Sequence, residues 1–143
     1  MSKNLRRGRT CVFALHVHLV FVTKYRRHVF TKSILSDLRE IFQSVCKDFN
    51  GELIELDGER DHVHLLISLF KNIALSDFLM MLKKDSSIWI KTKGKSFSDF
   101  HWQDGYGAFT VSHSDKDAVI EYIKGQEEHH KKISFKDELR EFL

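Results

Sequence analysis

The chain has 143 residues, a net charge of +3 and only two cysteines, Cys11 and Cys46. This length suits a single domain, residues 1–143, that buries a hydrophobic core without disulfides or structural metals. Two scattered thiols exclude a disulfide framework and a zinc ribbon. No apolar run reaches membrane-spanning length, and the basic N-terminus is followed by a strand pattern rather than by the apolar segment of a signal peptide. We therefore expect a cytoplasmic protein that makes no membrane contact.

The basic residues are clustered, which bears on the kind of partner. A solvated helix face explains any one cluster about as well as a ligand does. Five clusters together favour a polyanion, and nucleic acid is the expected partner. The clusters are Lys3, Arg6, Arg7 and Arg9; Lys24, Arg26 and Arg27; Lys83 and Lys84; Lys91, Lys93 and Lys95; and Lys131 and Lys132.

The first half of the chain predicts a strand, a helix and a hairpin. Residues 11–23 are β-branched, aromatic or aliphatic with polar residues at alternate positions, which is typical of a strand. Thr31 or Ser33 can cap a helix that ends near residues 49–51. Residues 52–56 and 62–69 then form a hairpin, for which Asp57-Gly58 is the expected turn.

The second half predicts two further helices, a fourth strand and a short tail helix. An amphipathic, basic helix follows Ser76 and breaks up at residues 92–95, and residues 100–112 contain the strand FTVS. Ser114 or Asp115 caps a helix from Lys116 to about Lys131, and residues 135–143 form the tail helix. The order strand, helix, strand, strand, helix, strand predicts an α+β fold: a ferredoxin-like split βαβ sandwich with a four-stranded antiparallel sheet. Its first and third strands lie side by side at the centre.

Two His-Val-His units fall on these two central strands. His62 and His64 share one face because side chains alternate along a strand, and Val63, Leu65 and Ile67 should pack on the helices from the other face. We expect the two imidazoles on the open face, where they could grip a divalent ion. For a lone His-x-His, structural histidines are the more common explanation. His16 and His18 obey the same geometry without a carboxylate or amide partner nearby in sequence.

A third motif is YIKGQEEHH, in which Tyr122 and Gln126 are four residues apart and share a helix face. A core tyrosine with a surface glutamine explains this pair about as well as a functional site does. The stretches HLVFVTKYRR, DHVHLLIS, LSDFLMMLKKDSS, WQDGYGAFTVS and YIKGQEEHH, in this order, resemble the single-tyrosine HUH transposases of the insertion sequence 200/605 family, together with the related proteins associated with repetitive extragenic palindromes (REP). The resemblance covers nearly the whole chain.

The resemblance implies a role for each of these residues. His62 and His64 would be metal ligands, Gln126 the third ligand, and Tyr122 the nucleophile on a C-terminal catalytic helix, while His18 would be structural or support a ligand and His16 stays unassigned. Two neutral imidazoles and an amide, without thiolate, fit Mg²⁺ or Mn²⁺ better than structural zinc. Gly125 departs from the asparagine common in relatives and loosens the helix by up to about 1 kcal/mol.

The resemblance also implies the partners. The substrate would be single-stranded DNA with subterminal hairpins, cut to leave a 5′-phosphotyrosine, and the enzyme a homodimer whose sites can be shared between subunits; no small-molecule substrate is implied. Lys24, Arg26, Arg27, Lys83 and Lys84 are the expected contacts to the DNA backbone. Two alternatives remain: a domesticated REP-type endonuclease and a non-catalytic module that binds single-stranded nucleic acid. A two-histidine phosphoesterase is disfavoured because it needs two His-x-Thr/Ser units.

Overall fold

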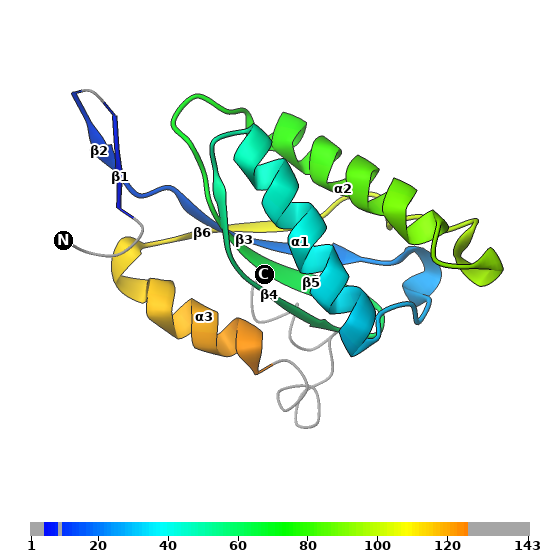
Figure 1. Cartoon of the computed structure of the whole chain (residues 1–143). Coiled ribbons are helices and arrows are strands. Elements are labelled where there is room, and N and C mark those ends of the chain that lie inside the picture. The colour runs from blue at the N-terminus through cyan, green and yellow to red at the C-terminus, as the bar shows by residue number, and fades with distance from the viewer. Residues whose placement is uncertain (1–4, 9, 126–143) are drawn as a thin grey trace.

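A computed structural model describes residues 5–8 and 10–125 and has the predicted order of elements (Figure 1). An N-terminal hairpin precedes a four-stranded antiparallel sheet of order β4-β5-β3-β6, so the first and third strands of the βαββαβ unit are central, as predicted. The strands are β1 (Arg6–Arg7), β2 (Val12–Phe13), β3 (His16–Val22), β4 (Glu52–Glu59), β5 (His62–Ser68) and β6 (Gly107–Val111). The helices are α1 (Lys32–Asp48), α2 (Leu75–Lys91) and α3 (Lys116–Lys124), with 3₁₀ turns η1 (Lys24–Arg26), η2 (Lys95–Phe97) and η3 (His113–Asp115).

The main core lies between the sheet and the pair α1 and α2, which cover the same face (Figure 1). Val63, Leu65 and Ile67 of β5 are fully buried in it, which confirms the predicted packing of the aliphatic trio. Helix α3 lies on the opposite face, where Leu66, Val111 and Ile123 form a second, smaller cluster. The two clusters make the sheet a central layer with helices on both sides.

Local sequence signals explain both ends of α1. The Oγ1 of Thr31 accepts a hydrogen bond from the Ile34 N–H at 3.2 Å, so Thr31 rather than Ser33 caps α1. At the other end Asn50 takes the left-handed conformation, φ 59°, that asparagine tolerates better than most residues. Helix α2 begins at Leu75, two residues before the expected start, and Asp115 rather than Ser114 precedes α3.

The predicted turn at Asp57-Gly58 is wrong. Strand β4 continues to Glu59, and a two-residue turn at Arg60 and Asp61 leads into β5. A Cβ at position 58 would clash with the backbone carbonyl oxygen of His62, so Gly58 allows the two strands to approach each other and makes no turn. The predicted single strand over residues 11–23 is likewise divided into β2 and β3.

Helix α3 ends at Lys124 and Gly125 forms a turn, so the predicted uninterrupted helix from Lys116 to about Lys131 is wrong. Residues 126–131 and the predicted tail helix at residues 135–143 lie outside the described ranges. Within those ranges, no helix combines the length and apolar character that crossing a membrane requires.

Candidate functional site

Strands β3 and β5 bring four histidines to one face of the sheet. Val22 pairs with His62, Val20 with His64 and His16 with Ser68, so His18 lies one step diagonally from His64. All four imidazoles are buried, with His64 fully inaccessible. The expected open face is therefore wrong, because α3 and the cluster around Leu66 cover it. Both His-Val-His units still share one face, as their spacing predicts.

The ring of His62 is oriented by a carboxylate. Its Nδ1 lies 2.8 Å from Oδ1 of Asp61, and Oδ2 of Asp61 accepts from Nε of Arg26 at 3.0 Å. Burial alone would raise the pKa of Asp61, but the hydrogen bond and charge of His62, together with Arg26, lower it to about 2. Asp61 is thus ionised at neutral pH, and it holds the Nδ1–H of His62 toward itself.

The ring of His64 is oriented by the other histidine unit. Nδ1 of His64 lies 2.9 Å from Nε2 of His18, and burial lowers the pKa of His18 to about 4, so His18 is neutral at pH 7. When His64 donates this hydrogen bond from Nδ1 and His18 accepts it, the Nδ1 atoms of both His62 and His64 are in hydrogen bonds. Each then presents the Nε2 lone pair, which is the tautomer of an imidazole that ligates a metal through Nε2.

Helix α3 places Tyr122 over these rings. The half-buried Tyr122 ring stands edge-on to His64 and to His18, with centroids 5.8 Å and 6.1 Å away. Helix α3 ends one turn later at Gly125, whose N–H bonds to the carbonyl oxygens of Glu121 and Tyr122. Gln126, the predicted third ligand, lies outside the described residues. The structure therefore brings Tyr122, His62 and His64 together.

The donor set of this face fits a divalent cation in part. Two buried imidazoles, each contacted by a second side chain, form half of a common four-ligand site. Among residues 5–8 and 10–125 no group of three or more histidine, cysteine or acidic side chains could hold a metal. A complete site thus needs ligands from the substrate or from other residues such as Gln126.

His16 lies apart from this arrangement. It is 2% exposed, its ring stacks on His113 with centroids 5.8 Å apart, and neither ring nitrogen has a hydrogen-bond partner in the described part of the chain. Burial, and then the charges of Lys116 and His113, lower the pKa of His16. His16 therefore stays neutral at physiological pH and takes no part in orienting His62 or His64.

The five predicted DNA contacts occupy two different environments. Lys24 and Lys84 are exposed, whereas Arg26 is bonded to Asp61 and Arg27 donates to Asp99 at 2.8 Å. These assignments stay predictions, but the arginines have structural roles that the sequence did not reveal.

Lys83 is half-buried, unlike the exposed Lys24 and Lys84. Its ammonium donates to the carbonyl oxygens of Gln103 and Gly105, at 3.0 and 2.5 Å, in the loop before β6. Burial lowers the pKa of Lys83, and the charge of Asp104 opposes this effect. Lys83 therefore fixes the loop before β6.

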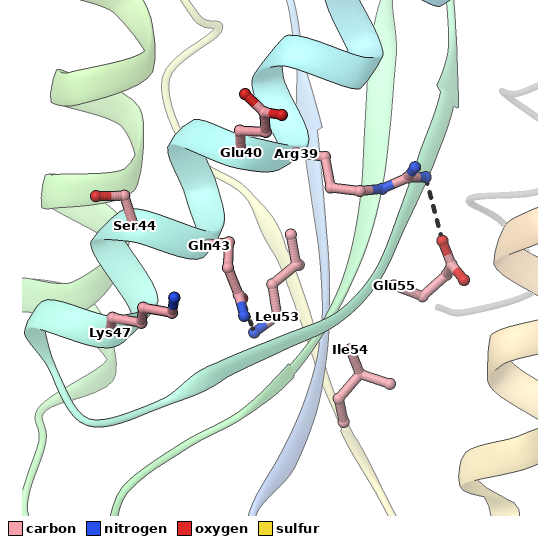
Figure 2. A pocket seen from close by; sticks show the side chains of 8 residues that line it. All are labelled: Arg39, Glu40, Gln43, Ser44, Lys47, Leu53, Ile54 and Glu55. Atoms are coloured by element: carbon pink, nitrogen blue, oxygen red, sulfur yellow. Dashed lines mark hydrogen bonds and ion pairs between the residues drawn. The ribbon is translucent and has the colours of Figure 1, made fainter.

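A hollow of about 490 Å³ between α1 and β4 contains none of the imidazoles (Figure 2). Figure 2 shows Gln43 reaching the backbone of Leu53, whose N–H donates to Oε1 at 2.8 Å, and Arg39 reaching Glu55 at 3.3 Å. These bonds tie the edge strand to α1. We therefore place the candidate site on the opposite face, under α3.

Comparisons with known proteins point to one family. The model of the family described as "Transposase IS200 like" matches residues 11–126. The ISDra2 transposase TnpA of Deinococcus radiodurans is 29% identical over 127 residues, covering 85% of this chain and 91% of the relative. The transposase of insertion sequence element IS200 from Salmonella typhimurium is 29% identical over 119 residues, which cover 80% of this chain and 78% of the relative.

Solved structures give the same picture. A crystal structure of a putative transposase from Deinococcus radiodurans has a TM-score of 0.67 and 28% identity, and the match covers 85% of this chain and 98% of that one. A REP-associated tyrosine transposase bound to a REP hairpin has a TM-score of 0.61 at 17% identity, with 87% and 72% coverage, which supports the fold.

Proposed function

Because the chain belongs to the family of IS200-like transposases, we propose that it cleaves and rejoins single-stranded DNA through a covalent bond between DNA and Tyr122. One observation carries this proposal. The Tyr122 ring stands edge-on to His64, with centroids 5.8 Å apart, above an imidazole pair whose Nδ1 atoms are engaged by Asp61 and His18. A phenol nucleophile and two potential ligands thus converge on one buried face.

The proposed step is a transesterification at a phosphodiester. The phenol of Tyr122 gives up its proton to solvent as its oxygen attacks phosphorus, the bond from phosphorus to the 3′ oxygen breaks, and this oxygen takes up a proton from solvent to leave as a 3′-hydroxyl. The product is a 5′-phosphotyrosine. Because an aryloxide leaves more readily than an alkoxide, a DNA 3′-hydroxyl can later attack the same phosphorus and release Tyr122. Strand transfer therefore needs no external energy source.

His62, His64 and Gln126 are the proposed holders of a Mg²⁺ or Mn²⁺ ion. When bound by these residues, such an ion would supply polarisation of the scissile phosphate and would neutralise charge that develops on the phosphate oxygens. Asp61 and His18 hold the two imidazoles in the ligating tautomer, and α3 excludes water from the rings. Lys24 and Lys84 are exposed and contribute salt-dependent attraction for the DNA backbone.

The proposed substrate is a single strand with subterminal hairpins, and the proposed enzyme is a homodimer whose sites can be shared between subunits, with Tyr122 acting on the histidines of its own chain or of the partner. Mixing two inactive variants tests this sharing. Tyr122→Phe and His64→Ala should each be inactive, and their mixture should regain cleavage, because one composite site then keeps both groups. A mixture that stays inactive although mixed dimers form would show that each subunit uses its own tyrosine.

The cleavage test uses single-stranded oligonucleotides from both flanks of the gene and others that carry REP-like palindromes. Each is incubated with protein and Mg²⁺ or Mn²⁺ and separated on a denaturing gel beside Tyr122→Phe. Tyr106→Phe is a matched control, because this exposed tyrosine lies on the loop before β6. A metal-dependent adduct that maps to Tyr122 and persists in the control supports the proposal.

The other outcomes separate the alternatives. An adduct with palindromic repeats but not with the flanks would assign a domesticated endonuclease. Tight binding of single strands without any adduct would exclude the enzyme and favour a binding module. An adduct that survives in Tyr122→Phe would exclude Tyr122 as the nucleophile.

A further inference from the structure

The loop that follows β3 is firmly anchored to the rest of the fold. Thr23 is 1% exposed, its N–H donates to the carbonyl oxygen of Asp61 at 2.9 Å, and its Oγ1 donates to that of Arg27 at 2.7 Å. The N–H of Lys24 donates to the carbonyl oxygen of His101 at 2.9 Å. Both ends of the stretch Lys24–Arg26 are therefore held in place.

The residue at the tip of this loop is held in an unusual conformation. Tyr25 has φ 61° and Arg26 has φ 53°, in the left-handed region that disfavours residues with a Cβ. Tyr25 is also 87% exposed, more than any other large hydrophobic side chain in the described residues. The fold thus keeps a strained backbone in order to present an aromatic ring to solvent, and such strain is concentrated at binding and active sites.

The surroundings of Tyr25 suit a polyanion that carries flat rings. The Nζ of Lys24 lies 5.5 Å from the centre of the Tyr25 ring. A hollow of about 450 Å³ beside the loop is lined in part by Tyr25, Arg27 and His101. This volume falls in the range of roughly 300–1,000 Å³ that is usual for pockets holding small ligands.

The loop is also joined directly to the proposed metal site. Arg26, the residue after Tyr25, bonds to Asp61, and Asp61 bonds to His62. Two hydrogen bonds therefore connect the loop to a proposed metal ligand. Arg26 and Arg27 are ion-paired to acidic side chains, whereas the Tyr25 ring is 87% exposed and Lys24 beside it is exposed.

We propose that Tyr25 stacks on an unpaired base of the single-stranded substrate next to the scissile phosphate, with Lys24 beside the adjoining backbone. This inference rests on the proposed cleavage of single-stranded DNA. Every base has a flat face, so a rigid aromatic ring can bind it without reading its edge. A base held here would fix the position of the strand relative to His62.

The test measures the affinity of Tyr25 variants for a set of cleavable single strands, each with an abasic site at a different position. Loss of one stacked base weakens binding by roughly 5- to 150-fold. We expect Tyr25→Ala to show such a loss and Tyr25→Phe to bind within about twofold of wild type. An abasic site at one position should weaken DNA binding by wild type to a similar extent. The same abasic site should not weaken DNA binding by Tyr25→Ala any further. The salt dependence should be unchanged, because stacking releases no counterions.

Two further variants separate binding from folding. Tyr25→Gly suits a positive φ, so its midpoint of thermal unfolding should be no lower than that of wild type although its DNA affinity falls. Ile88→Ala removes an exposed apolar side chain from α2 and should leave affinity unchanged.

Two results would overturn this inference while leaving the proposed function intact. In the first, wild type forms the adduct and Tyr25→Ala binds the single strand as tightly as wild type. In the second, Tyr25→Ala loses the same affinity at every abasic position, and its affinity depends less steeply on salt. The first leaves Tyr25 without a binding role, and the second indicates a backbone contact. If wild type neither cleaves nor binds single strands, the proposed function itself fails, and this inference with it.

Discussion

The carboxylate of Asp61 is the clearest place to test how the site is organised. Its side chain is 11% exposed and accepts hydrogen bonds from Nδ1 of His62 at 2.8 Å and from Nε of Arg26 at 3.0 Å. Asp61→Asn keeps the size and one acceptor but removes the charge. Its new NH₂ group faces one of two N–H donors, so at least one of these bonds is lost.

The expected loss can be worked out from this geometry. A hydrogen bond that involves a charged group contributes about 1.5–3 kcal/mol. Removing a side chain that orients a metal-ligating histidine usually weakens metal binding by about 10- to 100-fold. We therefore expect Asp61→Asn to bind Mn²⁺ about 10- to 100-fold more weakly, with cleavage restored in part by excess Mn²⁺.

Calorimetric titration of the folded protein with Mn²⁺ measures this loss. Asp37→Asn is a matched control, because Asp37 is also ion-paired, to Lys93 at 3.5 Å, but on the α1 side of the sheet. Its affinity for Mn²⁺ should equal that of wild type. If Asp61→Asn is folded and binds Mn²⁺ as tightly as the control, the carboxylate does not orient His62 for a metal and this reasoning is refuted.

Three further predictions concern folding and thiol chemistry. Gly58→Ala should lower the free energy of unfolding in urea by about 1–3 kcal/mol, since its Cβ meets the carbonyl oxygen of His62; an unchanged midpoint would contradict the close approach. Ser86→Ala leaves the buried indole N–H of Trp102 without its acceptor at 3.0 Å and should cost about 1–3 kcal/mol, measured in the same way; equal stability would mean that another acceptor replaces it. Burial raises the pKa of Cys46 to about 12 from an ordinary value of 9.0, so this thiol should resist alkylation at pH 8 until the protein unfolds. Because the unfolded chain loses this proton first, stability should also fall between about pH 9 and 12, and a Cys46→Ala variant should show less of this decline.

The order of elements could be predicted because each has a strong periodic pattern, but local signals gave the wrong position for the turn between β4 and β5. Asp57-Gly58 is a frequent turn pair, yet Gly58 is needed where two strands approach closely, and the turn falls at Arg60 and Asp61. The alternation in β5 gave the correct face for each side chain, but not what covers that face. The burial of His64 depends on α3, which docks through Leu66 and Ile123.

The paired His-Val-His units show where sequence reasoning about the site reached its limit. Spacing indicated that His18 and His64 share a face, and the structure adds that their ring nitrogens lie 2.9 Å apart, so one His-Val-His unit contacts the other. The charge cluster around Arg26 favoured phosphate contact, but Arg26 and Asp61 are 35 residues apart and meet because the loop after β3 lies against the β4–β5 turn. A count of basic residues cannot distinguish an arginine that binds a substrate from one that holds a carboxylate. In this chain the same loop contacts Asp61, which orients His62, and carries Tyr25, the proposed contact to a DNA base. A change at Arg26 should therefore affect metal binding and DNA binding together.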